Sequence, residues 1–230
     1  MKPSPKKEPP RPSGPPKKRI LIVDDHAIMR DGLTEVINRE PDLEICGQAG
    51  DAFAGLELAA STKPDLAVVD INIGGKNGLE LIKDLNVQQP QVAILVLSAH
   101  DETLYAERVL RAGGRGYVMK SEGSDRLVAA VREVLAGEIA VSTKVSEKIL
   151  HLVAGKSTDI SPVERLTDRE LEIFQLIGGG KDNTRIGDHL HISPKTVEVH
   201  RAHIKNKLKI SSNAELIAFA ARWIETCGAM

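Results

Sequence analysis

Short apolar runs alternate with longer amphipathic stretches over the first 138 residues of the chain. Five runs rich in Ile, Val and Leu predict buried strands at 20–23, 43–46, 66–69, 94–97 and 116–119. The segments between them have helical length and period, at 26–38, 52–61, 78–88, 102–112 and 124–136. Strands that alternate with helices predict an α/β fold, a doubly wound (βα)5 domain with a parallel sheet.

After Gly137 the pattern becomes helical. A linker helix is predicted at 144–153, followed by a turn-rich connection at 154–162. Four further helices are predicted, beginning near 168, 183, 194 and 213, and the first of them opens on a capping box of Thr167 and Glu170. The three-residue turn at 191–193 between the second and third helices is typical of a helix-turn-helix. The end of the chain is therefore predicted to be an all-α, four-helix helix-turn-helix domain.

Charge is distributed unevenly, although the net charge is only −1. Residues 1–19 carry seven Lys or Arg and one Glu, whereas residues 20–160 carry 14 basic and 22 acidic residues. Seven of the twelve prolines lie within 1–16, which favours disorder. The predicted organisation is a tail at 1–18, which is either merely solvated or touches DNA, an α/β domain at 19–138, a linker at 139–160 and the helical domain at 161–230.

The composition excludes several classes of protein. The longest apolar run, near 92–97, is far shorter than a membrane-spanning helix. The two cysteines, Cys46 and Cys227, are distant and form no metal-binding pair. We expect a cytoplasmic protein that does not associate with a membrane.

Polar residues follow four of the five predicted strands. Asp24 and Asp25 follow the first, Asp70 the third, Ser98 the fourth and Lys120 the fifth. The carboxyl ends of parallel strands meet at one edge of a sheet, so these side chains are expected to converge there. Any one of the carboxylates alone could simply cap a helix. Together they predict a Mg²⁺ site, since hard oxygen ligands select this ion. A carboxylate beside it can accept a phosphoryl group as an aspartyl phosphate.

This set, with Gly116–Lys120, resembles the receiver domain of two-component response regulators over residues 19–138. The resemblance implies that Asp70 is the phosphoacceptor and that Lys120 and Ser98 bind the phosphoryl group. It also implies that Ser98 and Tyr117 form a switch pair. The implied Mg²⁺ ligands are Asp24, Asp25, Asp70 and the backbone carbonyl of Asn72. The family usually has Met-Pro where this chain has Ile73-Gly74, and we expect Gly74 and Gly75 to loosen this loop.

The third helix of the helical domain combines a buried face with a basic one. Val197, Ile204 and Leu208 form an apolar stripe, and Lys195 to Lys209 include five basic residues against one Glu. This pattern predicts a recognition helix for the major groove, although a solvated basic face would look similar. The candidate DNA-binding residues are Lys195, Thr196, Glu198, Val199, His200, Arg201 and Lys205, with a base contact for Arg201 and a phosphate contact for Lys205.

The sequence motifs of this domain resemble those of the LuxR-type DNA-binding domain over 161–225. Leu166–Glu172 and Ile192–Arg201 carry most of the resemblance. With the receiver they are similar to the NarL/FixJ family of response regulators. Membership implies phosphorylation of Asp70 by a sensor histidine kinase, binding to double-stranded DNA, and a homodimer in the phosphorylated or DNA-bound state, with contacts often made by 213–224.

Two other functions are compatible with some of these features. A Mg²⁺-dependent phosphohydrolase could use Asp70 as its nucleophile, but Asn72 stands where many such enzymes have a general acid. A phosphate-independent DNA-binding scaffold would have no use for the Asp, Ser and Lys set. We therefore predict a phosphorylation-switched transcription regulator that catalyses only its own phosphotransfer and slow self-dephosphorylation.

Overall fold

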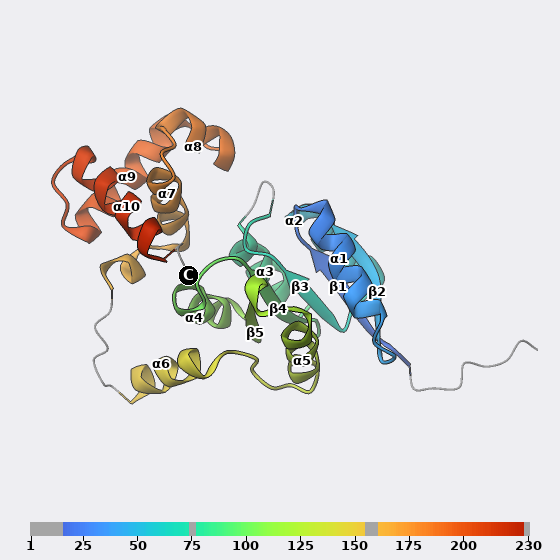
Figure 1. Cartoon of the computed structure of the whole chain (residues 1–230). Coiled ribbons are helices and arrows are strands. Elements are labelled where there is room, and N and C mark those ends of the chain that lie inside the picture. The colour runs from blue at the N-terminus through green and yellow to red at the C-terminus, as the bar shows by residue number, and fades with distance from the viewer. Residues whose placement is uncertain (1–15, 74–76, 155–160, 228–230) are drawn as a thin grey trace, which may run out of the picture.

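The computed structural model describes residues 16–73, 77–154 and 161–227, and Figure 1 shows its architecture. A five-stranded sheet carries helices on both faces, and a cluster of helices follows it, which confirms the predicted fold class. Two predictions fall outside the described residues, namely most of the disordered tail at 1–18 and the loop at Gly74 and Gly75. No helix in the described part of the chain is long and apolar enough to span a membrane.

The sheet is parallel throughout, with the strand order β2-β1-β3-β4-β5. Its strands are β1 (Lys18–Val23), β2 (Leu43–Ala49), β3 (Leu66–Val69), β4 (Ala93–Ser98) and β5 (Gly116–Met119). The register pairs Val23 with Val69, so the residues that follow β1 and β3 lie next to each other. The strand order reverses direction around β1, and sheets of this kind bind ligands at the carboxyl edge beside that point.

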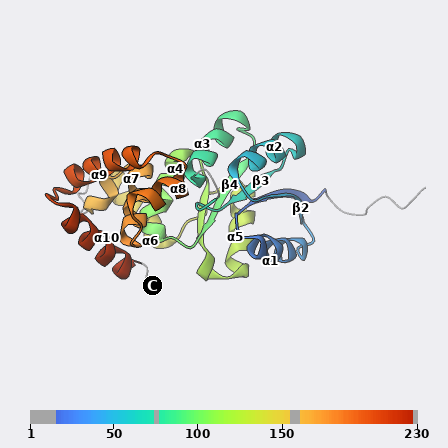
Figure 2. The ribbon, with the colours of Figure 1, turned by 90° about the horizontal axis from the view of Figure 1, so that it is seen from above.

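Helices bury both faces of the sheet because its strands are apolar on both sides. One face is covered by α1 (Ala27–Asn38) and α5 (Ser124–Leu135), whose buried residues share a core with those of β1, β3 and β4. The other face is covered by α2 (Ala52–Thr62), α3 (Gly78–Gln88) and α4 (Glu102–Ala112). Figure 2 shows α1 and α2 on opposite sides of the sheet.

The C-terminal helices are α7 (Asp168–Gly178), α8 (Asn183–Leu190), α9 (Pro194–Leu208) and α10 (Asn213–Cys227). Phe174 of α7 anchors their core, with its ring centroid 5.6 Å from that of Trp223 and 5.9 Å from that of Phe219, both on α10. The predicted capping box is present, because Thr167 accepts from the backbone of Glu170, whose side chain accepts from the backbone of Thr167.

The connection between the two sets of helices adds two features. Ala140 forms a parallel bridge with Gly116 at the outer edge of β5, and its backbone exchanges hydrogen bonds with Arg115 and Tyr117. The linker helix α6 (Thr143–Val153) then packs against α4. Two 3₁₀ helices, η1 (Lys120–Glu122) and η2 (Pro162–Arg165), are present that the sequence pattern did not predict, and β2 runs three residues further than expected, to Ala49.

Candidate functional site

The carboxyl ends of β1 and β3 bring Asp24 and Asp70 together. The backbone N–H of Asp70 donates to Val23 at 2.8 Å, which fixes the start of the loop after β3. Both carboxylates are buried, at 2% and 5% exposure. Two buried carboxylates in contact repel each other, so this arrangement requires a compensating cation.

Lys120 supplies a compensating positive charge from the end of β5. Its Nζ donates to Oδ2 of Asp24 and to Oδ2 of Asp70, each at 2.7 Å. Burial lowers the pKa of Lys120, but the bonds from the two carboxylates outweigh it and raise that pKa above its usual value. Burial raises the pKa of Asp70 above its usual value, although the hydrogen bond from Lys120 lowers it in part. Lys120 therefore remains a cation within the acidic cluster.

The second oxygen of Asp70, Oδ1, is buried and has no hydrogen-bond partner among the described residues. Ligand atoms of Asp24, Asp25, His26 and Asp70 lie within 4.8 Å of one another. Asp25 is half-exposed, and its Oδ1 lies 2.6 Å from Nδ1 of His26. Carboxylate oxygens facing a common centre, one of them unpaired, fit a hard divalent cation that retains some of its water. Asn72 borders the same pocket as Asp25.

Ser98 and Tyr117, the predicted switch pair, are both fully buried beside this cluster. Ser98 Oγ accepts from the backbone N–H of His100 at 3.3 Å, and the Tyr117 hydroxyl donates to the His100 carbonyl at 2.8 Å. Burial raises the pKa of the Tyr117 phenol far above its usual value, so this hydroxyl is a donor at any physiological pH. The His100 ring stacks on Tyr105 of α4, with centroids 4.8 Å apart. A path of direct contacts thus joins Ser98 to α4.

Nothing in the sequence pattern marks His100 as the link in this path, because its main-chain carbonyl, rather than its side chain, receives the Tyr117 hydroxyl. Glu102 also differs from expectation. At the start of the helix predicted at 102–112, an acidic residue is expected to cap the helix or face solvent, yet Glu102 accepts from Ser142 Oγ at 2.7 Å. The N-cap of α4 is instead Asp101, whose carboxylate accepts from Thr103. Both differences arise from tertiary contacts that helix-capping signals do not encode.

Helix α9 has the predicted division into a buried and an exposed face. Ser193 caps it by accepting from Thr196, and Val197 and Ile204 are fully buried. Of the candidate DNA-binding residues, four are exposed and His200 and Lys205 are half-buried; the exposed ones are Lys195, Thr196, Glu198 and Val199. Lys195 Nζ lies 2.8 Å from Glu198 Oε2, so the basic surface at this turn is partly neutralised.

Arg201 is placed differently from the other candidates. It is buried at 9% exposure, and its guanidinium donates to Oδ1 of Asn183 on α8 at 2.9 Å. Because it sits four residues after Val197 and three before Ile204, the helical period puts it on the packed face. The expectation that Arg201 reads a base is thus at odds with its position. Arg201 is buried and links the two helices of the helix-turn-helix by a hydrogen bond.

Two protein-family models match the chain. Residues 20–132 match the response regulator receiver domain, and residues 164–220 match the bacterial regulatory proteins of the luxR family. The fold and the acidic site are therefore those of a response regulator. More narrowly, the chain belongs to the response regulators that join a receiver domain to a LuxR-type DNA-binding domain, as the NarL/FixJ family does. Receiver domains typically hold Mg²⁺ at an acidic pocket like this one.

Relatives of known name match over most of their length. The oxygen regulatory protein NreC of Staphylococcus haemolyticus is 34% identical over 210 residues, covering 89% of this chain and 97% of that protein. The transcriptional regulatory protein LiaR of Bacillus subtilis is 34% identical over 206 residues, with the same coverage.

Solved structures agree on the fold. A LuxR-family two-component response regulator from Aurantimonas is 32% identical, with a TM-score of 0.56 over 60% of this chain and 99% of that one. The RcsB response regulator of Salmonella typhimurium is 20% identical, with a TM-score of 0.69 over 90% of this chain and 98% of that one. The second likeness extends over both domains and supports the architecture alone.

Proposed function

We propose that this response regulator is switched by phosphorylation of Asp70 and acts as a sequence-specific DNA-binding transcription regulator. The observation that carries the proposal is the geometry at Asp70. One of its oxygens is held by Lys120, and the other, Oδ1, is buried and has no partner among the described residues, in a cluster suited to a divalent cation.

The residues of the site divide the work of phosphoryl transfer. Asp70 Oδ1 attacks phosphorus, and the bond from phosphorus to the donor nitrogen or oxygen breaks with its electron pair leaving on the donor. Lys120 neutralises charge on the phosphoryl oxygens, and the hydroxyl of Ser98 donates to one of them. Asp24, Asp25, Asp70 and the carbonyl of Asn72 would hold Mg²⁺. The ion would supply charge stabilisation to the transferring group when bound.

The phosphoryl group biases a two-state equilibrium rather than creating new chemistry at the DNA. Ser98 and Tyr117 reposition around it, and the change passes through His100 to α4. The exposed residues of α9 then contact a duplex, with α10 as the contact between two copies. A sensor histidine kinase is the proposed physiological donor, and the cytoplasm is the proposed location of the reaction. No other catalytic activity is proposed, beyond self-phosphotransfer and slow self-dephosphorylation.

Replacement of the acceptor tests this proposal. Asp70→Asn should abolish the incorporation of phosphate from acetyl phosphate with Mg²⁺, because an amide oxygen is a poor nucleophile and ligand. Asp51→Asn is the matched control, since Asp51 caps α2 and Asn caps equally well. Intact-mass measurement should show the added phosphoryl group in the wild type and in Asp51→Asn only. Labelling of Asp70→Asn at the wild-type level would show that the acceptor is another residue.

A further inference from the structure

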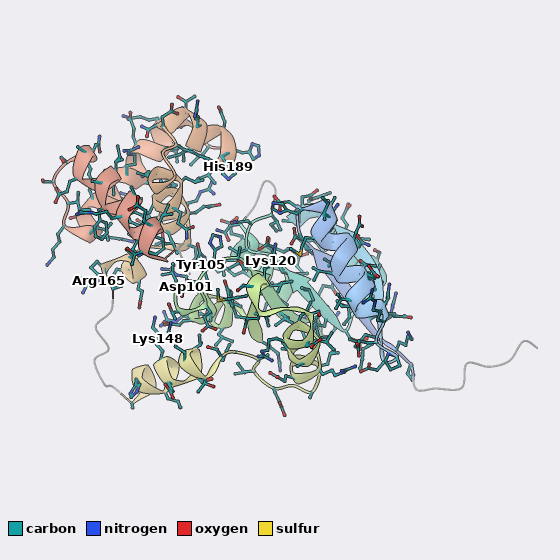
Figure 3. All side chains as sticks on the ribbon, viewed as in Figure 1. Asp101, Tyr105, Lys120, Lys148, Arg165 and His189 are labelled. Carbon is teal, nitrogen blue, oxygen red and sulfur yellow. The ribbon has the colours of Figure 1, made fainter. Side chains whose placement is uncertain are left out.

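The two domains are joined by a set of contacts centred on α4. The Tyr105 hydroxyl donates to Oε1 of Gln175 on α7 at 2.9 Å, and Tyr105 is buried by this contact, at 3% exposure. Figure 3 shows Tyr105 between the receiver and the C-terminal helices. The apolar cluster on the α4 face of the sheet continues into Leu171 and Phe174 of the second domain. The interface therefore has an apolar as well as a polar component.

Arg108, one turn further along α4, makes three bonds across this interface. Its guanidinium donates to Oδ1 of Asp168 at 2.9 Å and to the carbonyls of Glu164 and Leu166 at 3.1 and 2.7 Å. The Arg108 side chain is 14% exposed, so these are not loosely held surface pairs. A planar guanidinium that meets several acceptors at fixed positions determines orientation as well as contact. We call Tyr105, Arg108, Asp168 and Gln175 the α4 clamp.

The clamp places the second domain beside the phosphorylation site. A pocket of about 660 Å³ lies between them. The receiver contributes Asp25, Asn72 and His100 to its lining, and the second domain contributes Arg169, Gln175 and His189. His189 is seen on the side of the helical domain that faces the sheet in Figure 3. The pocket beside the phosphorylation site, which the predicted Mg²⁺ ligands Asp25 and Asn72 border, thus has a wall that belongs to the DNA-binding domain.

The recognition helix takes no part in this wall. Both views show α7 and α8 toward the receiver and α9 on the far side (Figures 1 and 2). The pocket lining drawn from the second domain comes from α7, from α8 and from His191. Docking in this arrangement therefore limits access to Asp70 and leaves the predicted DNA-contacting face open.

The size of the pocket discriminates between phosphodonors. Pockets of roughly 300–1,000 Å³ accommodate small ligands. A phosphohistidine carried on a helical domain needs room for a helix about 10–12 Å in diameter, and usually for more than one. On the side of the site that the second domain walls, the pocket has space for the first kind of donor and too little for the second.

From this geometry, and resting on the proposed function, we propose that the α4 clamp sets phosphodonor specificity. With the clamp closed, Asp70 takes its phosphoryl group from small acyl phosphates. In that transfer the bond from Asp70 oxygen to phosphorus forms, and the donor carboxylate leaves with the electron pair of the broken phosphorus–oxygen bond. Transfer from a protein-borne phosphohistidine requires the clamp to open, so its rate scales with the open fraction.

The test compares two donors on the full-length chain with Mg²⁺. The small donor is acetyl phosphate, and the large one is a histidine phosphotransfer domain phosphorylated chemically with phosphoramidate. Arg108→Ala removes the central cation of the clamp. Arg111→Ala is the matched control, because Arg111 lies on the same helix, its side chain is 79% exposed, and in the described part of the chain its ion pair is with Glu107 of α4 itself. Small-angle scattering reports whether the two domains remain docked.

Arg108→Ala should increase the radius of gyration and raise the rate from the phosphotransfer domain about tenfold, since the open fraction multiplies that rate. Its rate with acetyl phosphate should stay within about twofold of wild type, because the small donor enters either state. Arg111→Ala should match the wild type in both assays. Asp168→Asn weakens the bonds that Arg108 and Lys83 make to the second domain. It should reproduce the effect, which separates the clamp from any local damage to α4.

The inference is overturned if the ratio of the two rates is the same in Arg108→Ala, Asp168→Asn and wild type, including the case of no transfer from the phosphotransfer domain to any of them. It is also overturned if both variants stay as compact as the wild type. Failure of the proposed function looks different, because acetyl phosphate would then label wild type and Asp70→Asn alike.

Discussion

At the scale of single residues, the phosphorylation site was predictable because the register of parallel strands determines which residues meet at the edge of the sheet. Asp24, Asp70, Ser98 and Lys120 each directly follow or end a buried strand, and parallel strands align these positions at one edge. The hydrogen bonds of Lys120 to both carboxylates could not be predicted, since they depend on side-chain reach within the folded site. Asp25, one residue beyond Asp24, points outward to His26 because consecutive side chains diverge at a strand end.

Arg201 shows the opposite case, in which the helical spacing indicated the correct position but the prediction followed the residue type. Its spacing from Val197 and Ile204 puts it on the packed face, yet a positive charge on a recognition helix suggests DNA contact. The Arg201 guanidinium donates to Asn183 inside the domain, while its Nε is buried with no partner among the described residues. Helical period was here a better guide than residue type.

Arg201 and Lys205 should therefore separate into a structural and a DNA-binding residue. Arg201→Ala removes a buried charged hydrogen bond and the packing of its stem, and should lower the free energy of unfolding by about 1–3 kcal/mol. Lys205→Ala should leave stability unchanged and reduce the salt dependence of DNA affinity by about one phosphate contact. Denaturant unfolding and a salt titration with duplex DNA measure the two effects. An unchanged unfolding midpoint for Arg201→Ala would contradict its structural role.

At the scale of elements, α7 is the helix on which the DNA-binding domain is assembled. Glu170, predicted only as the second half of a capping box, is buried at 4% exposure. Its Oε2 also accepts a hydrogen bond from Nζ of Lys207 on α9 at 2.6 Å. The capping box was evident in the sequence because its two members are three residues apart. The contact with Lys207 spans 37 residues and depends on how α9 crosses α7, which no local pattern specifies.

The contact should make the stability of this domain depend on pH in the acid range. Burial raises the pKa of Glu170, but the bonds from Lys207 and Thr167 outweigh it, so the pKa lies below its usual 4.5 in the folded state. The carboxylate therefore stabilises the fold above about pH 4.5, and this contribution is lost as pH falls through the folded-state pKa. Glu170→Gln should cost about 1–2 kcal/mol at pH 7, with a gap from wild type that narrows as the pH falls below the usual pKa of 4.5.

Thermal unfolding from pH 7 to pH 3 measures this gap. Glu172→Gln is a suitable comparison, since Glu172 lies on the same helix and pairs with Arg169 three residues away. Such local surface pairs contribute about 0–1 kcal/mol. A gap for Glu170→Gln that stayed constant across the pH range would count against a stabilising carboxylate.

At the scale of the whole molecule, the (βα)5 sheet and the helix-turn-helix followed from periodicity, because each element buries a face that its own residues define. The contacts between the domains could not be predicted from periodicity, because nothing in the sequence distinguishes Arg108 and Asp168 from other charged residues until the fold brings them together. The bridge at Ala140 could not be predicted either, because a single paired residue leaves no periodic pattern in the sequence. The helices and strands could thus be predicted from the sequence, whereas the placement of the two domains relative to each other could not.

The bridge at Ala140 bears on where the receiver can be cut. A fragment that ends at residue 138 exposes the outer edge of β5, whereas one that ends at 142 keeps the bonds of Ala140 to Arg115 and Tyr117. Exposed strand edges pair with other chains. The 1–138 fragment should therefore self-associate in sedimentation experiments at concentrations at which 1–142 is monomeric. Identical sedimentation of the two fragments would show that the bridge does not protect the edge.

The same bridge at Ala140 has a consequence for the newborn chain. Synthesis proceeds from the N-terminus, so β5 leaves the ribosome before Ala140 does. For that interval, while α5 is also being made, the outer edge of β5 is open, and open strand edges can pair with neighbouring nascent chains. The bridge follows β5 in the sequence by only about twenty residues, which at roughly 5–20 residues per second limits the exposure to a few seconds. A cap placed so soon after its strand protects the protein during translation as well as in its finished form.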